Sequence, residues 1–437
     1  MSVRDRLKIV RPLSIRDFAL LWTGMSVSMV GDGISFVALA WQVYELANSP
    51  AAMSVVGVAW SLPLVVFLLI GGVVSDRFDR RRVMIVSDLV RAAAIGSMGA
   101  LSVAGALRLG HVVVLIAVYG AAEAFFSPAF GAIVPDLVPS GMLLEASSLE
   151  QFVRPTATQL VGPALGGFGI AAFERAGWGV GGVFLADAAS FVCAAACVAG
   201  IRTVAAGGVT EAESRSPLVE IAQGFRFVRS RAWLWATLCM TLVTLLFYMG
   251  PWEVLLPYVV RNELGGGADD LGLVFAWGGG GSVLASLAMA QRGLPRRHVR
   301  FMYVASALEV FGVAGYAFAG APWHAMAICF VGSGCATAAM VVWGTLLARL
   351  VPAHLQGRVR SLDWLLSTAL LPVSFAVTGP IAGAVGARAT LIGAGVLGGI
   401  ATLSFMMVPG LYDTERDGSV HGCAAPSEQA EREAPAA

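Results

Sequence analysis

The sequence predicts an all-α integral membrane protein whose twelve transmembrane helices form two pseudo-symmetric six-helix halves. Of its 437 residues, 57% are hydrophobic and only 13% are charged, whereas soluble globular domains carry roughly 25% charge. The apolar residues recur in blocks of about 20, the length that crosses a hydrocarbon core of ~30 Å. A repeat relates the first part of the chain to the second.

The apolar blocks predict twelve spans, each of which tolerates internal glycine and proline because neighbouring helices satisfy the freed backbone groups. We expect no cleaved signal peptide, because residues 1–17 are basic and polar and the first apolar stretch is longer than an h-region. In chain order the predicted spans cover 18–44, 51–74, 83–107, 111–134, 150–172, 179–200, 232–260, 268–290, 299–320, 322–347, 361–385 and 388–409.

The basic residues predict the orientation of the chain. With a cytoplasmic N-terminus, alternation of the spans places 23 of the 29 lysines and arginines on the cytoplasmic side. The opposite side receives four, and Arg91 and Arg154 lie near the ends of spans. The positive-inside rule therefore predicts an even number of spans and two cytoplasmic termini.

The longest interior polar stretch, residues 201–231, is predicted to be a cytoplasmic linker between the halves 18–200 and 232–409. Its second part fits either a short amphipathic helix on the membrane surface or an extension of the seventh span. Residues 410–437 are expected to be a disordered cytoplasmic tail. The formal net charge of +1 indicates that the basic loops reflect topology and not nucleic-acid binding. No metal or cofactor is expected, because no His or carboxylate joins Cys193 and Cys197 at ligand spacing.

Three pairs of segments carry the repeat. Residues 137–139 and 148–150 match residues 350–352 and 361–363 at a constant offset of 213, and the dipeptide 162–163 matches 379–380 at an offset of 217. Shared proline, Ser-Leu-acid and Gly-Pro elements are much less expected by chance than shared apolar letters. The repeat therefore predicts two equivalent halves in parallel arrangement.

The loop after the second span carries the clearest motif, which runs Gly72-Val-Val-Ser-Asp76-Arg77-Phe-Asp79-Arg80-Arg81-Arg82. It resembles the signature loop of the major facilitator superfamily, Gly-x-x-x-Asp-Arg-x-Gly-Arg-Arg, with Asp79 in place of the second glycine. Positive-inside charge explains the arginines but not Asp76. The resemblance implies a gating loop made by Gly72, Asp76, Arg77, Arg80 and Arg81. Asp76 would meet the N-terminus of the eleventh helix, and the arginines would pair with acids such as Asp136, Glu150 or Asp363 as a latch.

The fifth span contains Gly162-Pro163-Ala-Leu-Gly166-Gly167, which resembles the core of the antiporter motif of drug efflux proteins. Thr158 stands where that motif has a further glycine, and the arginine that many drug–proton antiporters carry early in the fourth helix is absent. Small residues at this spacing permit close helix contact and a bend at the proline. Generic helix packing is the alternative interpretation.

Together with the Gly31-Asp32-Gly33 segment and residues 223–228, these motifs resemble the branch of enterobactin exporters, macrolide efflux proteins and multidrug exporters, over residues of about 15–410. The resemblance implies a monomeric transporter of the bacterial inner membrane that exports hydrophobic small molecules by proton antiport. A siderophore, secondary metabolite or lysolipid is the alternative cargo. A membrane enzyme is disfavoured because the five histidines are scattered and no nucleotide-binding loop occurs.

Intramembrane carboxylates are candidate functional residues, because a charge inside the bilayer is costly. Asp32, Glu123 and Glu253 are predicted to couple protons or bind substrate, whereas Asp187 and Glu309 are expected to be structural. The spacing of Asp88 and Arg91 indicates a local ion pair. The only candidate cavity arginines, Arg91 and Arg154, lie near the ends of spans, which favours neutral or cationic cargo over an anionic siderophore. The aromatic candidates for stacking on substrate include Trp41, Phe126 and Trp252.

Overall fold

The computed structural model describes residues 8–202 and 225–416, and the elements in this part of the chain are helical. The linker residues 203–224 and the tail residues 417–437 lie outside the described residues. The first half comprises η1 (Lys8–Ser14), α2 (Arg16–Ala47), α3 (Pro50–Arg77), α4 (Arg80–Val103), α5 (Leu109–Leu137), η2 (Ser140–Met142), α6 (Leu143–Pro155), η3 (Thr156–Val161), α7 (Gly162–Arg175) and α8 (Gly179–Ala199). The second half comprises α10 (Ala232–Gly250), η4 (Pro251–Leu255), α11 (Leu256–Asn262), α12 (Ala268–Arg292), α13 (His298–Tyr316), α14 (Pro322–Leu350), α15 (Ala353–Ala369), α16 (Leu371–Val385), α17 (Ala387–Ser404), η5 (Phe405–Met407) and α18 (Asp413–Arg416).

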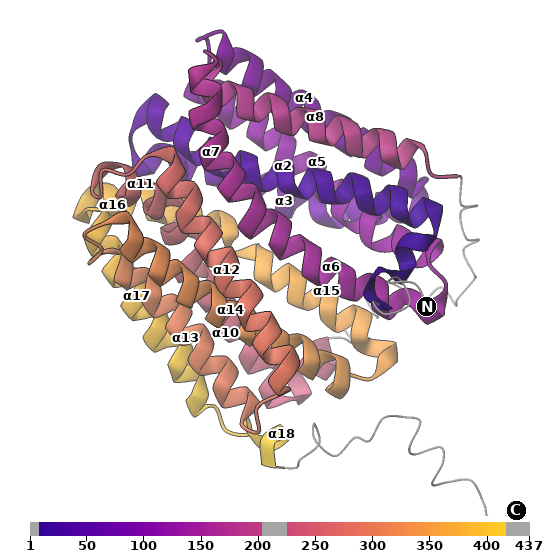
Figure 1. The fold of residues 1–437 in the computed structure, drawn as a ribbon. Helices are drawn as coiled ribbons and strands as arrows, with labels where there is room; N and C mark the ends of the chain where they lie inside the picture. The colour runs from indigo at the N-terminus through magenta and orange to yellow at the C-terminus, as the bar shows by residue number, and fades with distance from the viewer. Residues whose placement is uncertain (1–7, 203–224, 417–437) are drawn as a thin grey trace, which may run out of the picture.

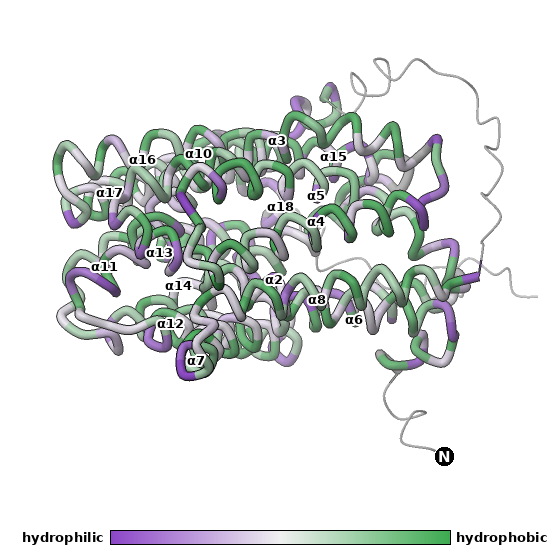
Figure 2. Tube along the Cα trace, turned by 90° about the horizontal axis from the view of Figure 1, so that it is seen from above, coloured by the Kyte–Doolittle hydropathy of each residue, from purple (hydrophilic) through white to green (hydrophobic). Residues whose placement is uncertain are grey.

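Within the described residues, ten helices are long and apolar enough to cross a membrane. Two further helical runs complete the expected twelve. The run 143–175 is interrupted and polar in its first part, and α13 has 19 residues that include Arg300 and Glu309. Figure 2 shows hydrophobic residues along the helices and hydrophilic residues concentrated at the connections. The prediction of an all-helical membrane protein is confirmed.

Three of the spans are interrupted. The fifth contains the π-helical turn η3 between α6 and α7, and the seventh contains the π-helical turn η4 between α10 and α11. The eleventh changes from α15 to α16 at Leu370, directly before the helix that begins Leu371-Pro372. Pro163, Pro251 and Pro372 each lie at or just after an interruption, because proline cannot supply the N–H that a continuous helix needs.

Asp79, which replaces the signature glycine, has a clear structural role. It is the N-cap of α4, and its carboxylate accepts a hydrogen bond of 3.0 Å from the backbone N–H of Arg81. The cap explains why α4 begins at Arg80, three residues before the predicted span. Arg80–Arg82 are therefore helical residues and not loop residues.

The two halves meet at one end of the bundle. We call the end with the α3–α4 and α12–α13 connections the basic end, because the arginines gather there, and the opposite end the far end (Figure 1). The largest apolar core lies toward the far end and draws on both halves, for example on Val37 and Val56 from the first and Val254 and Leu271 from the second.

At the basic end each half has a core of its own. One contains only residues between Phe18 and Ile201, and the other only residues between Val228 and Leu411. Because the halves share a core at the far end and have separate cores at the basic end, the bundle is closed at the far end.

Two contacts show how close this far-end seal is. The Tyr44 hydroxyl on α2 donates a hydrogen bond of 2.5 Å to the carbonyl oxygen of Val254 in η4. Gly57 of α3 faces the ring of Phe375 on α16 so closely that a Cβ at Gly57 would lie 2.5 Å from the ring. Only a glycine at position 57 permits this approach of α3 and α16.

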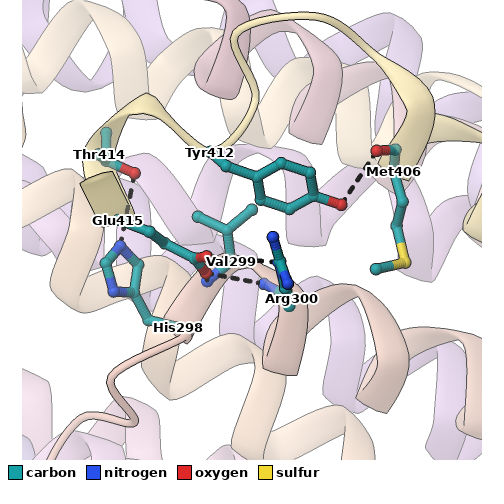
Figure 3. A network of polar contacts seen from close by, with 7 residues as sticks. All are labelled: His298, Val299, Arg300, Met406, Tyr412, Thr414 and Glu415. Carbon is teal, nitrogen blue, oxygen red and sulfur yellow. Dashed lines mark hydrogen bonds and ion pairs between the residues drawn. The ribbon is translucent and has the colours of Figure 1, made fainter. Parts of the chain in front are cut away.

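The segment after α17 corrects the prediction of a disordered tail from residue 410. Leu411 is fully buried, and α18 packs against the beginning of α13 (Figure 3). The Glu415 carboxylate accepts hydrogen bonds from the backbone N–H groups of Val299 (2.7 Å) and Arg300 (3.1 Å). An acid at a helix N-terminus satisfies free N–H groups and complements the helix dipole. These contacts hold residues 411–415 in place.

Candidate functional site

A polar cavity of about 200 Å³ lies in the first half. The residues that line it come from the middle and basic-end parts of α2, α4, α5, α6 and η3. Its lining contains acids, arginines and hydroxyl groups together with the apolar side chains of two phenylalanines and two methionines. The lining residues are Met25, Met29, Asp32, Arg91, Glu123, Phe126, Ser127, Phe130, Gly131, Glu150, Arg154 and Thr158.

Asp32 enters this cavity because the glycines on either side of it let α2 pack tightly on two neighbours. A Cβ at Gly31 would collide with the Asp187 carboxylate on α8. A Cβ at Gly33 would lie 2.9 Å from Gly162 Cα at the start of α7. Close helix packing through small residues is common in membrane bundles. The two glycines thus bring α7 and α8 against α2 and leave Asp32 at the cavity.

The two central carboxylates each accept a hydrogen bond from an aromatic side chain. The Tyr119 hydroxyl donates to Asp32 Oδ1 (2.8 Å), and Trp60 Nε1 donates to Glu123 Oε2 (3.0 Å). Tyr119 and Glu123 are one turn apart on α5, so this helix supplies the donor of the first hydrogen bond and the acceptor of the second. Each carboxylate accepts one of these two hydrogen bonds and has oxygen lone pairs left to accept others.

Arg91 is the buried cation of the site. It lies midway along α4, is 4% exposed, and forms an ion pair with Asp88, which is fully buried. Its guanidinium carbon lies 4.2 Å from the ring centre of Phe126 and 4.5 Å from that of Phe191. The predicted ion pair is therefore present. The expectation that Arg91 lies near the end of a span is wrong, because α4 begins at Arg80.

Asp187 extends the cluster behind α2. It is 1% exposed, contacts Gly31, and accepts a hydrogen bond of 3.0 Å from Ser190. The region thus contains four buried or half-buried carboxyl groups (Asp32, Asp88, Glu123 and Asp187) around the guanidinium of Arg91. A cluster of this composition in a membrane favours the uptake of protons or of a cation, because four ionised carboxylates would leave a costly excess of negative charge.

A second ion pair lies at the edge of the cavity. Arg154 donates a hydrogen bond of 2.8 Å to Glu150 one turn away on α6, and the two side chains are 49% and 33% exposed. Charged side chains at this depth avoid lipid and face water-filled space. The exposed pair therefore places the opening of the cavity on the side of the basic end.

The gating-loop arginines contact their own half. Arg80 donates to Asp136 (2.5 Å) and to the carbonyl oxygen of Ala132 (3.0 Å), as predicted for Asp136. Arg81 donates to the carbonyl oxygens of Val198 and Ala199 at the end of α8. Both arginines thus tie the start of α4 to the ends of α5 and α8.

The other predicted partners of the loop are engaged elsewhere in this state. Glu150 pairs with Arg154, and Asp363 accepts a hydrogen bond of 3.1 Å from Trp343 Nε1. Neither contacts Arg80 or Arg81, because α6 and α15 are held by partners within their own halves. Gly72 faces open space, Arg77 is exposed, and the side chain of Asp76 lies outside the described residues.

The Gly-Pro motif of the fifth span joins helices of both halves. Gly162 and Gly166 face α2, where a Cβ would lie 2.6 Å from Gly33 Cα and 2.7 Å from the carbonyl oxygen of Ile34, respectively. Gly167 faces α12 of the second half, where a Cβ would lie 2.7 Å from the carbonyl oxygen of Ala268. Pro163 follows the π-helical turn η3 directly. The motif therefore allows α7 to pack closely on both α2 and α12, directly after the chain changes from the π-helical turn η3 to an α-helix.

Three predicted residues lie outside this cavity. Trp41 donates a hydrogen bond to Glu45 (2.9 Å) and lies under the guanidinium of Arg261 at 4.9 Å. Trp252 packs edge-on against Phe275 with ring centres 5.2 Å apart, within the shared far-end core. Glu253 belongs to the adjacent π-helical turn η4. Of the aromatic candidates, Phe126 lines the cavity, and the two tryptophans belong to the far-end seal.

Comparisons with known proteins agree with this architecture. A family model described as transmembrane secretion effector matches residues 8–428. The multidrug efflux pump Tap of Mycolicibacterium fortuitum is 30% identical over 404 residues, which cover 87% of this chain and 91% of that protein. Macrolide efflux protein A of Streptococcus pyogenes is 26% identical over 249 residues, which cover 57% of this chain and 60% of that protein.

Among solved structures, a bacterial homologue of the human lysosomal transporter Spinster, in an inward-facing and unoccupied conformation, has the same fold. Its TM-score is 0.66 at 13% identity, with 95% of this chain and 99% of that chain covered. The match of the family model over almost the whole sequence confirms the resemblance inferred from the motifs. The chain therefore belongs to the transmembrane secretion effector family of the major facilitator superfamily, and it is a transporter and not an enzyme.

Proposed function

We propose that this transporter exports hydrophobic, drug-like small molecules in exchange for protons through alternating access. The basic end faces the cytoplasm of a bacterium, and both termini lie on that side of the inner membrane. The distribution of arginines supports this orientation, and two relatives with efflux in their names support export. In this orientation the closed far end faces outward and the cavity is reached from the cytoplasm. The transporter works as a monomer, since each half supplies its own core and the two halves share a third.

The observation that carries the proposal is the acid-rich, aromatic-lined cavity. Asp32 and Glu123 provide acceptor oxygens, and Phe126 and Phe130 belong to the same lining. Such a site suits an apolar molecule with a positive charge, because the carboxylates attract a cation and the aromatic side chains pack against apolar groups. Substrate that enters from the cytoplasm displaces protons from the carboxyl groups. After the halves rock about their shared core and the far end opens, protons from outside replace the substrate.

Cation or neutral cargo is favoured over an anionic siderophore by the state of Arg91. Its guanidinium already pairs with Asp88 and lies between two aromatic rings, so its positive charge is compensated within the protein. A screen with dyes, macrolides, tetracyclines and a siderophore in cells that express the gene distinguishes these cargo classes. Export of the siderophore alone would replace the drug-like assignment with the alternative.

Transport into inverted membrane vesicles tests the coupling. Asp32→Asn should abolish substrate uptake driven by a proton gradient, whereas the protein remains inserted and monodisperse. Glu309→Gln provides a matched control, because it neutralises another half-buried carboxyl group on α13, outside the cavity. Full proton-driven uptake by Asp32→Asn would remove this residue from the mechanism.

A further inference from the structure

The second half carries a groove on its outer surface that is unconnected with the polar cavity. It has a volume of about 360 Å³ and is lined almost entirely by apolar side chains of α12, α13 and α14. Both α12 and α13 pack along α14 but scarcely touch each other, so α14 forms the floor between two walls (Figures 1 and 2). The lining residues are Gly281, Leu284, Ala285 and Ala288 of α12, Phe301, Val304, Ala305 and Leu308 of α13, and Phe330, Val331, Gly334, Cys335 and Ala338 of α14.

The length of the groove along the helices fits within one leaflet of a bilayer. Its residues cover 281–288 on α12 and 301–308 on α13, which at 1.5 Å per residue correspond to roughly 10 Å along the bundle. Half of a hydrocarbon core is about 15 Å. Both ranges lie in the halves of these helices nearer to the basic end. The groove therefore opens toward the acyl chains of the leaflet at that end, which the proposed orientation makes the cytoplasmic leaflet.

A short basic loop lies beyond one end of the groove. The connection 293–297 joins the two walls directly, and its sequence Gly-Leu-Pro-Arg-Arg follows Arg292. Gly293 takes a positive φ of 70° and Pro295 restricts the backbone further, so the loop has little conformational freedom. Arg292 is the last residue of α12, and Arg296 and Arg297 are the last residues of the loop, so all three lie about one helical turn beyond the lining residues Ala288 and Phe301.

These three arginines are available to a ligand. All three are exposed, and no described carboxylate lies within ion-pair distance of them. Arg300 differs, because it pairs with Glu415 at 3.7 Å and stacks on Tyr412 (Figure 3). Glu415 also occupies the N–H groups at the start of α13. The N–H groups at this helix terminus are therefore occupied, and the positive charge without a described carboxylate partner at this end of the groove comes from the three arginines.

We propose that this groove binds an anionic phospholipid, with an acyl chain between α12 and α13 and its phosphate at Arg292, Arg296 and Arg297. An apolar groove that lies within one leaflet suits a lipid chain. Three unpartnered cations at its mouth select a negative headgroup, since basic pockets between membrane helices recognise such headgroups. The binding site lies outside the transport cavity, and its occupancy does not depend on the proposed export activity.

Native mass spectrometry of the full-length protein tests the site. The purified transporter is loaded with phosphatidylglycerol or phosphatidylcholine of the same acyl chains, and retained lipid is measured at increasing collision energy. Phosphatidylglycerol should be retained in preference. Arg296→Gln/Arg297→Gln should reduce its retention roughly fivefold for each arginine. Arg226→Gln/Arg229→Gln removes the same charge from another exposed segment of the chain and should leave retention unchanged.

A groove-filling variant tests the contribution of the acyl chain to lipid binding separately from that of the headgroup. Ala288→Phe places a ring between the walls and should also release phosphatidylglycerol, whereas the arginines are intact. Release by the arginine variant alone would indicate surface charge binding, and release by the filling variant alone would indicate a neutral lipid or another apolar occupant. Equal retention of both lipids, or loss with the control variant, would likewise overturn the proposal.

Cys335 supplies a measurement that needs no substitution. It lies in the groove floor, and its alkylation by a maleimide can be quantified at the peptide level in the wild-type protein. Phosphatidylglycerol should slow this alkylation severalfold, and phosphatidylcholine or soluble glycerol phosphate should not. Equal protection by all three, or by none, would contradict a lipid bound through both its chain and its headgroup.

Discussion

Arg91→Gln is the substitution whose cost the structure determines best. It removes the cation from Asp88, which is fully buried, and from the faces of Phe126 and Phe191. Loss of one partner from a buried ion pair typically costs about 3–5 kcal/mol, because the other charge remains without compensation. The whole free energy of unfolding of a domain is about 5–15 kcal/mol. The single variant should therefore be severely destabilised.

The double variant Asp88→Asn/Arg91→Gln should recover most of this loss. It replaces the ion pair by two amides that can bond to each other, and only the contacts of the cation with the rings, about 0.5–2 kcal/mol, stay lost. The coupling energy is the summed cost of Asp88→Asn and Arg91→Gln alone minus the cost of the double variant. Because either single variant leaves an uncompensated buried charge, this energy should be at least about 4 kcal/mol, above the range of about 0.5–3 kcal/mol usual for residues in contact.

Unfolding with a denaturing detergent in mixed micelles, followed by circular dichroism, provides the free energies for this cycle. Arg154→Gln is the matched control, since its pair with Glu150 is half-exposed and should cost less than about 1 kcal/mol. A coupling energy below about 0.5 kcal/mol between Asp88 and Arg91, or equal costs for Arg91→Gln and Arg154→Gln, would refute the account of a desolvated pair.

Three further substitutions test other parts of the structure. Gly33→Leu should prevent α2 from packing on α7, because even a Cβ would lie 2.9 Å from Gly162, and a monodisperse, fully active variant in size-exclusion chromatography and transport assays would contradict that contact. Asp76→Asn should slow turnover more than it weakens substrate binding if the loop acts as a latch, so an effect on affinity alone in binding and transport titrations would argue against gating. Glu415→Ala should cost about 0.5–2 kcal/mol, as for loss of a helix cap, and should speed amide hydrogen exchange at Val299 and Arg300; unchanged exchange would show that α18 does not hold α13.

The composition and spacing of the sequence predict the helices but not their exact depth. The third span was expected at 83–107, whereas α4 covers Arg80–Val103, because the Asp79 cap recruits three arginines into the helix. The shift places Arg91 three residues further from the start of its helix, at the middle of α4. A helix cap followed by arginines was the signal that could have placed Arg91 in the site.

The fifth span shows a related limit. It was expected to begin at residue 150, but α6 begins at Leu143. Its polar residues, such as Glu150 and Arg154, lower the hydropathy because they face the cavity and not lipid. Hydropathy alone underestimates a helix wherever that helix lines water-filled space.

The candidate site was predictable in part. The intramembrane acids Asp32 and Glu123 both line the cavity, and their role in coupling or substrate binding stays a prediction. The donors Tyr119 and Trp60 could not be assigned, because such contacts depend on how each helix is rotated about its axis. Glu253 lies within the predicted seventh span, but in the turn η4 beside the far-end core. Its position outside the polar cavity results from tertiary packing, which the sequence pattern does not indicate.

Proton release on substrate binding tests the central claim most directly. The purified protein is mixed with a transported substrate in weakly buffered solution that contains a pH-sensitive dye. The wild-type protein should release protons as the substrate occupies the cavity, and Asp32→Asn/Glu123→Gln should release none although Glu309→Gln behaves as wild type. Substrate binding without proton release by the wild-type protein, or the same release by the double variant, would contradict proton exchange at these two carboxyl groups.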